Sequence, residues 1–172
     1  MAIMKNKLRW LILLTPILLF AVVTMLGNRD RTPINTPKLQ AILSRADYVS
    51  VFNARTALTD TTITQAEQTF YQGKSANRFA KHFRLSDSPP DKNTQPNSVN
   101  SYHCDFMDSN KEGSASQVAY IIVSFDSVSK EHYARIKAPA MNGLFVLEES
   151  AARDLSEIFA AHDARMNKLS AQ

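Results

Sequence analysis

The sequence predicts an α+β fold, in which one domain with a mainly antiparallel sheet of about five strands packed with helices follows an N-terminal transmembrane helix. Three observations predict it. The chain begins with a long uncharged apolar run, its second half holds several short β-like segments, and its last segment has apolar residues at helical spacing. A length of 172 residues suits a single domain. With 44% hydrophobic and 21% charged residues, a wholly disordered chain is excluded.

The N-terminus predicts membrane attachment. Residues 1–9 contain three cations and no acid, and they form the expected cytoplasmic flank of a transmembrane signal-anchor at residues 10–27. At about 1.5 Å per residue, this uncharged run spans most of a ~30 Å hydrocarbon core. We therefore expect a single-pass protein of the bacterial inner membrane, with its C-terminal domain in the periplasm. Cleavage as a signal peptide is the alternative, although the run is long and no small-x-small cleavage site follows it.

A short spacer at residues 28–36 and an extracytoplasmic domain at residues 37–172 are expected beyond the anchor. The whole chain carries a net charge of +4, but most of this excess belongs to the cytoplasmic flank. The outer part is nearly neutral and has no strong electrostatic footprint for nucleic acid. Its charge is nevertheless uneven, because residues 28–86 are net positive and residues 87–172 are net negative.

The first elements of the domain follow from capping and side-chain type. Thr36 and Pro37 are typical of an N-cap and a first helical residue, so a helix is expected at 37–45. Residues 48–52 are β-branched and aromatic, and they predict a strand.

A second helix is expected at 65–72, because Thr64 and Glu67 fit a capping box and Gly73 suits a helix end. The apolar residues of 75–85 fit both a helix and a strand, and we favour the helix.

Residues 86–100 are rich in proline and small polar residues and predict a loop that is long for a compact domain. Beyond it, alternating or continuous apolar residues predict four more strands, at 102–107, 117–125, 131–137 and 143–147. The second of these is apolar on both faces, which indicates a central strand. Residues 148–168 predict a C-terminal amphipathic helix whose apolar stripe includes His162.

The string around Cys104 contains the residues of most chemical interest. Neighbouring residues of a strand point to opposite faces, so His103 and Asp105 share one face while Cys104 lies on the other. His103 therefore does not readily activate Cys104, and we interpret this cysteine as a buried core residue. A single cysteine also excludes an internal disulfide and CxxC-type sites.

His103 and Asp105 are the weak candidates for catalysis, as an orienting pair or as two metal ligands whose third partner would be His132 or a distant carboxylate. A hydrogen-bonded or solvated strand face is the favoured interpretation. No nucleotide-binding, serine-hydrolase or zinc-peptidase motif occurs, and we expect neither a cofactor nor a metal.

Four cations with no acid between them form the candidate binding residues: Lys74, Arg78, Lys81 and Arg84. Such a run is often a solvated face, but it also suits contact with an acidic partner or with anionic lipid. The function expected from the sequence is thus a membrane-anchored, non-catalytic protein-interaction module of a bacterial envelope, as an accessory subunit whose partner is another envelope protein. The alternatives are a periplasmic inhibitor, immunity-type or ligand-binding protein released by signal cleavage, and an envelope hydrolase using His103 and Asp105.

Overall fold

The computed structural model describes residues 35–54, 68–90, 94, 101–109, 115–126 and 129–169. The expected cytoplasmic flank, the signal-anchor and most of the spacer therefore lie outside the described residues. Residues 33–172 group into one compact unit. None of the helices in the described ranges has the length and apolar character needed to cross a membrane.

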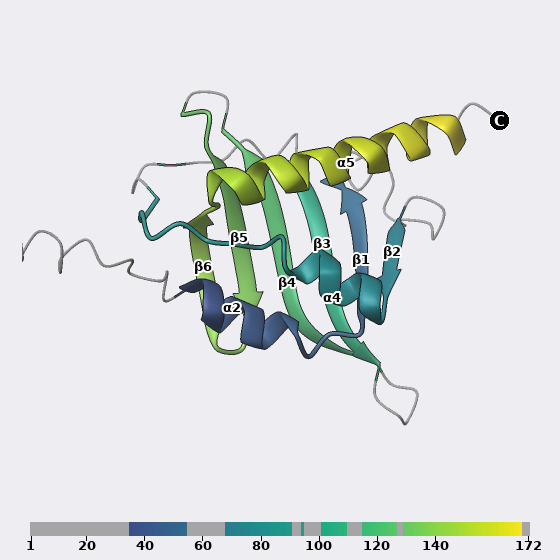
Figure 1. Ribbon diagram of the computed structural model, residues 1–172, viewed down its shortest axis with the longest axis horizontal. Helices are drawn as coiled ribbons and strands as arrows, with labels where there is room; N and C mark the ends of the chain where they lie inside the picture. Colours follow the sequence, from purple (N-terminus) through teal and green to yellow (C-terminus); the bar gives the residue numbers. More distant parts are fainter. Residues whose placement is uncertain are drawn as a thin grey trace, which may run out of the picture. The chain divides into compact units, whose positions relative to one another are not determined.

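The described strands form one antiparallel sheet with the order β2-β1-β3-β4-β5-β6 (Figure 1). Their bounds are β1 Tyr48–Asn53, β2 Thr69–Gln72, β3 Ser101–Ser109, β4 Ala115–Phe125, β5 His132–Ala138 and β6 Met141–Val146. The two longest strands, β3 and β4, lie at the centre of the sheet. This confirms the α+β class and the central position expected for the strand with apolar residues on both faces.

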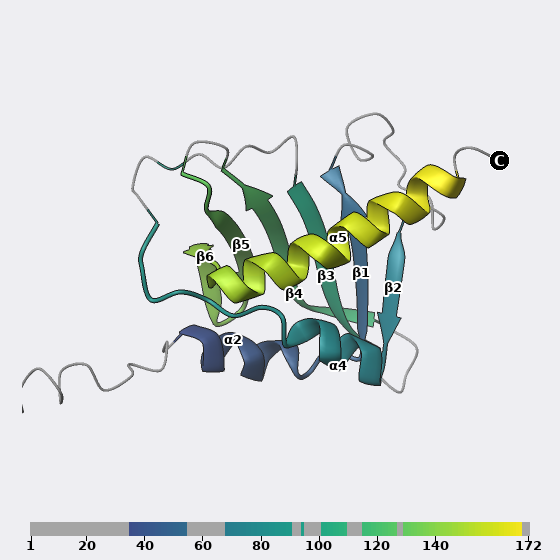
Figure 2. The ribbon, with the colours of Figure 1, turned by 45° about the horizontal axis from the view of Figure 1, so that its top comes forward.

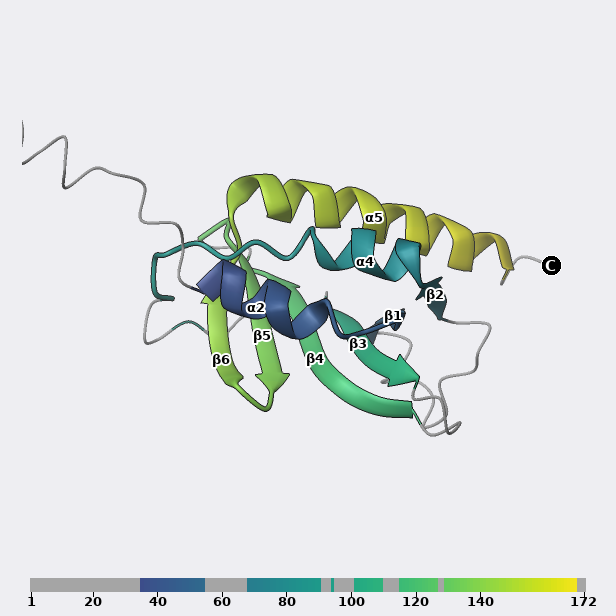
Figure 3. The same cartoon turned by 60° about the horizontal axis from the view of Figure 1, so that its bottom comes forward.

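The helices described here all pack on one face of the sheet (Figure 3). Their bounds are α2 Asn35–Leu43, α4 Lys74–Ala80 and α5 Glu149–Leu169. The expected C-terminal helix is thus confirmed as α5, which crosses the sheet diagonally, while α2 and α4 lie beside each other near one end of the strands (Figure 2). Gln40 of α2 ties these two helices together by donating to the carbonyls of Ala80 and Phe83, each at 2.9 Å.

The core lies between this helical layer and the sheet. Register aligns Val51, Cys104, Ile121 and Ile136 across four strands, and all four side chains are fully buried. Because side chains alternate along a strand, His103 and Asp105 point to the opposite face, which carries no described helix. Burial of Cys104 and of Phe106 on the same face confirms the expected arrangement of β3.

The sheet has one strand more than expected, because residues 69–72 form β2 and not the end of a helix. The helix prediction is wrong here, whereas the capping-box residues Thr64 and Glu67 lie outside the described residues. Thr69 to Gln72 pair in register with β1, and Phe70 packs beside Tyr48 with ring centroids 5.4 Å apart. A pairing partner some twenty residues away thus overrides the local helix signal, as tertiary context commonly does.

The start of α2 also differs from expectation. The helix begins at Asn35, inside the expected spacer, and Pro37 occupies its first turn, where its missing N–H is tolerated. The hydroxyl of Thr36 accepts a hydrogen bond from Leu85 N at 2.8 Å and donates one to Leu85 O at 3.1 Å. Thr36 therefore satisfies the backbone of a distant segment, where the sequence suggested an N-cap.

The ambiguous segment at 75–85 contains both conformations. It is helical through Ala80, and Leu85 then forms an isolated antiparallel bridge with Leu147. Gly73, expected to end a helix, instead joins β2 to α4 with a φ of +53°, a conformation that glycine adopts without steric cost. Residues 86–90 and 94 of the expected loop are neither helix nor strand, and the rest of that loop lies outside the described residues.

Candidate functional site

His103 and Asp105 lie on the sheet face opposite the described helices, as the alternation along β3 predicts. His103 Nδ1 is hydrogen-bonded to the Tyr120 hydroxyl, and Asp105 Oδ1 accepts a hydrogen bond from Gln117 Nε2 at 2.8 Å. Burial lowers the pKa of His103 and raises the pKa of Asp105. Each residue is thus engaged with its own neighbour on β4.

The third ligand considered for this pair is on the wrong face. His132 lies across from Phe125 at the start of β5 and shares the inward face with Ala134 and Ile136. His132 and His103 are therefore separated by the sheet, because alternation puts them on opposite faces. Within the described ranges, His, Cys, Asp and Glu side chains do not gather in a group of three that would hold a metal ion.

Cys104 is fully enclosed among apolar side chains of the core. Burial is the main cause that raises the pKa of its thiol, and the charge of Asp105 acts in the same direction. Since the thiolate is the nucleophilic form, this cysteine is an inert apolar side chain.

Three of the four cations singled out in the sequence are exposed, two on α4 and the third at its C-cap. Lys74, Arg78 and Lys81 recur at intervals of four and three residues, so they follow one side of the helix, while Ala76 and Phe79 are buried in the core.

Arg84 differs from these three because it joins the start of α5. Its guanidinium is 3.3 Å from Glu148 and 3.2 Å from Asp154, and it also donates to Ser150 at 3.1 Å. Hydrogen bonds from His82 and from Arg84 lower the pKa of Asp154. Arg84 therefore fastens the segment after α4 to the first turns of α5.

Two further exposed cations belong to α2 and the turn after it, and α2 is a neighbour of α4. We call these five residues the α2/α4 basic surface: Lys38, Arg45, Lys74, Arg78 and Lys81. In the described part of the chain none of the five makes an ion pair. Residues 35–46 and 73–84 contain no acid. Sequence reasoning did not single out Lys38 and Arg45, because the packing of α2 beside α4 is not a local property of the sequence.

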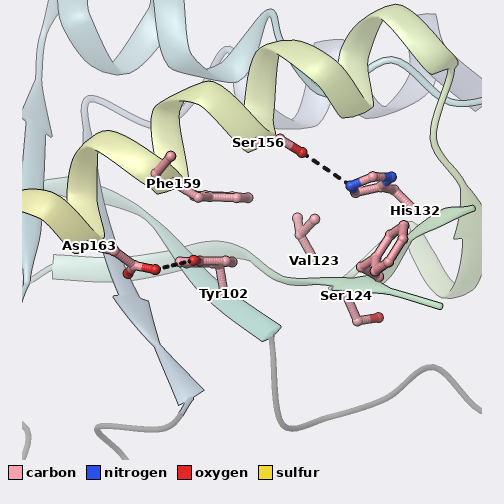
Figure 4. A pocket seen from close by; sticks show the side chains of 9 residues that line it. Tyr102, Val123, Ser124, His132, Ser156, Phe159 and Asp163 are labelled. Atoms are coloured by element: carbon pink, nitrogen blue, oxygen red, sulfur yellow. Dashed lines mark hydrogen bonds between the residues drawn. The ribbon is translucent and has the colours of Figure 1, made fainter. Parts of the chain in front are cut away.

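A groove of about 310 Å3 opens between α5 and the ends of β3, β4 and β5 (Figure 4). Its lining side chains are Tyr102, Val123, Ser124, Phe125, His132, Ser156, Phe159, Ala160 and Asp163. Beside the groove, α5 crosses the strands at an angle (Figure 2). Its volume is at the lower end of the range of small-molecule pockets, about 300–1,000 Å3.

Aromatic rings give the groove its shape. Tyr102 stacks on Phe159 with ring centroids 4.1 Å apart and planes 5° apart, and Phe125 packs against His132 with centroids 4.8 Å apart. The first pair fixes α5 to β3, and the second joins the ends of β4 and β5. The walls are therefore held by contacts between elements that are distant in sequence.

Polar groups occupy the two ends of the groove, with Val123 and Phe159 between them (Figure 4). At one end the Tyr102 hydroxyl donates to Asp163 Oδ2 at 2.6 Å, and Asn53 Nδ2 is 3.3 Å from Asp163 Oδ1. At the other end Ser156 Oγ lies 3.1 Å from His132 Nε2.

The Ser156–His132 pair is not arranged as a nucleophile and its base. Ser156 donates its single hydroxyl proton to the Ala152 carbonyl at 2.8 Å, so the hydrogen bond with His132 must be donated by Nε2–H. Burial lowers the pKa of His132, which favours the neutral ring. A neutral imidazole that donates through Nε2 does not take a proton from Ser156 through that nitrogen.

The sequence contained only a weak signal for this groove. Ser156 and Asp163 are polar residues next to the apolar stripe of α5, seven residues apart and therefore on the same side of the helix. The buried position expected for His162 in that stripe is confirmed, with its Nδ1 2.7 Å from Thr69 Oγ1. The partners of Asp163 come from β1 and β3 and depend on the register of the sheet.

Comparison with protein-family models, curated proteins and solved structures finds no match to this chain.

Proposed function

We propose that the chain is a membrane-anchored, extracytoplasmic interaction module of a bacterial envelope, acting without catalysis as an accessory subunit of a larger assembly. Its docking site is the α2/α4 basic surface, and its partner is the acidic surface of another envelope protein. The observation that carries the proposal is the set of five exposed cations on or just after two neighbouring helices, none of which makes an ion pair within the described part of the chain.

Electrostatics supports an acidic partner. In water at physiological salt, charges interact over a Debye length of about 8 Å, so clustered cations act together while isolated ones do not. A surface that carries one sign of charge without internal counter-ions attracts a surface of opposite charge, and this attraction raises the rate at which the two proteins associate. Residues 28–172 are nearly neutral as a whole, so the domain has no general excess of positive charge beyond such local clusters.

The anchor is supported by the uncharged run at residues 10–26 and by the cations that precede it. Attachment would hold the basic surface at a membrane where partner subunits are concentrated. The intact mass of the protein recovered from membranes tests this part of the proposal. A mature chain shortened by about 27 residues would instead favour a periplasmic inhibitor or immunity-type protein released by signal cleavage.

The described residues give the hydrolase alternative little support. Asp105 and His103 each bind a different β4 side chain, Cys104 is enclosed in the core, and the hydroxyl proton of Ser156 is held by a backbone carbonyl. Replacing His103 and Asp105 by alanine should therefore leave the cellular role intact if the fold is preserved. Complete loss of that role in a folded variant would favour the hydrolase.

Charge reversal on α4 tests the docking surface. Arg78→Glu combined with Lys81→Glu changes the charge of this surface by four units without touching the core. Arg135→Glu combined with Lys137→Glu is the matched control, because these exposed cations are on β5, on the opposite face of the sheet. Tagged full-length protein is crosslinked in intact membranes, and partner recovery is quantified by mass spectrometry.

We expect recovery of the partner to fall about tenfold or more with the α4 variant, equivalent to about 1.4 kcal/mol, and to stay near the wild-type value with the β5 variant. Introducing lysines into the acidic surface of the recovered partner should restore binding to the α4 variant. Equal recovery with both variants, or recovery of no protein at all, would contradict the proposed docking site.

A further inference from the structure

The groove beside α5 contains the carboxylate of Asp163 and no lysine or arginine, in contrast to the α2/α4 basic surface. We propose that it binds a small organic cation, namely a primary amine on a flat apolar body with a hydroxyl group at the far end. The proposal depends neither on the anchor nor on the basic surface, and it concerns residues on other elements.

The negative end of the groove is Asp163. Its hydrogen-bond partners, the Tyr102 hydroxyl and the Asn53 amide, are neutral, and within the described part of the chain its carboxylate makes no ion pair. A carboxylate offers about four acceptor positions, so two of them remain for a ligand. The lining includes no lysine or arginine, so an anionic ligand would meet a negative charge without compensation.

The middle of the groove suits a flat apolar body. Val123 and Phe159 lie between the two polar ends, and Tyr102 and Phe125 add aromatic surface (Figure 4). Aromatic faces attract cations as well as apolar groups, and the ring of Tyr102 lies beside the carboxylate that would hold the ammonium. The volume of about 310 Å3 accommodates one ring with short substituents.

The far end of the groove accepts hydrogen bonds. Ser156 Oγ has given its proton to the Ala152 carbonyl, and His132 donates to it through Nε2, so one lone pair of Oγ and the Nδ1 atom of His132 remain as acceptors. A ligand hydroxyl is the complementary donor. Ser156 and Asp163 are two helical turns apart, about 10.5 Å along the axis, so a ligand with donors at opposite ends of one ring bridges them.

Tyramine is the probe that carries all three features. Its binding to the full chain in nanodiscs is measured by calorimetry, with empty nanodiscs as the reference. Tyrosol has a hydroxyl in place of the ammonium, so comparison with it measures how much the positive charge contributes to the affinity. The anion p-hydroxyphenylacetate tests whether the groove distinguishes the sign of the ligand's charge. We expect tyramine to bind about tenfold or more tightly than tyrosol, and the anion not to bind, because hydrogen bonds to charged groups are the stronger ones.

Two variants locate the binding. Asp163→Asn removes the charge with little change in shape, and it should bring the affinity for tyramine down to that for tyrosol. Ala160→Met narrows the groove from an exposed helical position, and it should abolish binding of both compounds. Ala161→Met is its control, because Ala161 is an exposed neighbour outside the lining.

Circular dichroism verifies the fold of each variant, and Ala160→Met decides alone if Asp163→Asn is misfolded. The proposal is overturned if tyramine does not bind the full chain, if tyrosol binds equally well, or if Ala160→Met binds tyramine as Ala161→Met does.

Discussion

Truncation of Phe159 to alanine should separate α5 from the sheet at the groove. This side chain is 4% exposed and stacks on Tyr102, so its removal leaves a cavity that surrounding side chains fill only in part. Phe→Ala changes in cores cost about 3–5 kcal/mol, which includes the lost transfer energy and the cavity. Small domains unfold with a total of about 5–15 kcal/mol, so this variant should be close to marginal stability.

Phe70→Ala is the matched control, since the chemical change is identical and the environment differs. Phe70 is 37% exposed on the edge strand β2 and contacts Tyr48. Its removal loses about 1–2 kcal/mol of apolar burial and creates no enclosed cavity. Because Phe70 lies on the edge strand β2, the control also tests the assignment of that strand.

The two variants are compared by urea unfolding of the full chain in detergent micelles, followed by circular dichroism. With a slope of about 1–3 kcal/mol per molar urea, a difference of about 2 kcal/mol between them separates their midpoints by roughly 1 M. Equal losses from the two variants, at unchanged slope, would refute the packing of α5 and the edge position of β2.

Three further outcomes are expected. Cys104 should resist thiol reagents in the folded protein and react only on unfolding, and rapid labelling of native protein would contradict its burial. Stability should fall as the pH drops below about 6.5, because burial lowers the pKa of three histidines in the folded state: His103, His132 and His162. A urea midpoint at pH 5.5 equal to that at pH 7.5 would contradict this sign, and His162→Gln should reduce the dependence. Gln40→Met should cost about 1–3 kcal/mol because it removes the side-chain donor to the carbonyls of Ala80 and Phe83, of which the Ala80 carbonyl keeps the Phe83 N–H as a donor, whereas Gln72→Met, at an exposed position, should cost little.

Much of the fold was predictable because the relevant signals are local. Apolar side chains at period two mark strands, and those at helical spacing mark α5, whatever their partners are. The inward position of Cys104 and the shared face of His103 and Asp105 follow from the same alternation. The strand β2 was missed because four residues are too few for a periodic pattern, and its pairing with β1 is not a local property.

The candidate sites also contain features that the local sequence predicts and features that depend on distant contacts. By itself the sequence determined the fold class, the order of most elements and the run of cations on α4, since each depends on neighbouring residues. Only the tertiary structure decided that Arg84 binds Asp154, 70 residues away, and that Tyr102 meets Asp163, 61 residues away. Strand register and the diagonal path of α5 bring these groups together, and both are set by packing of the whole core.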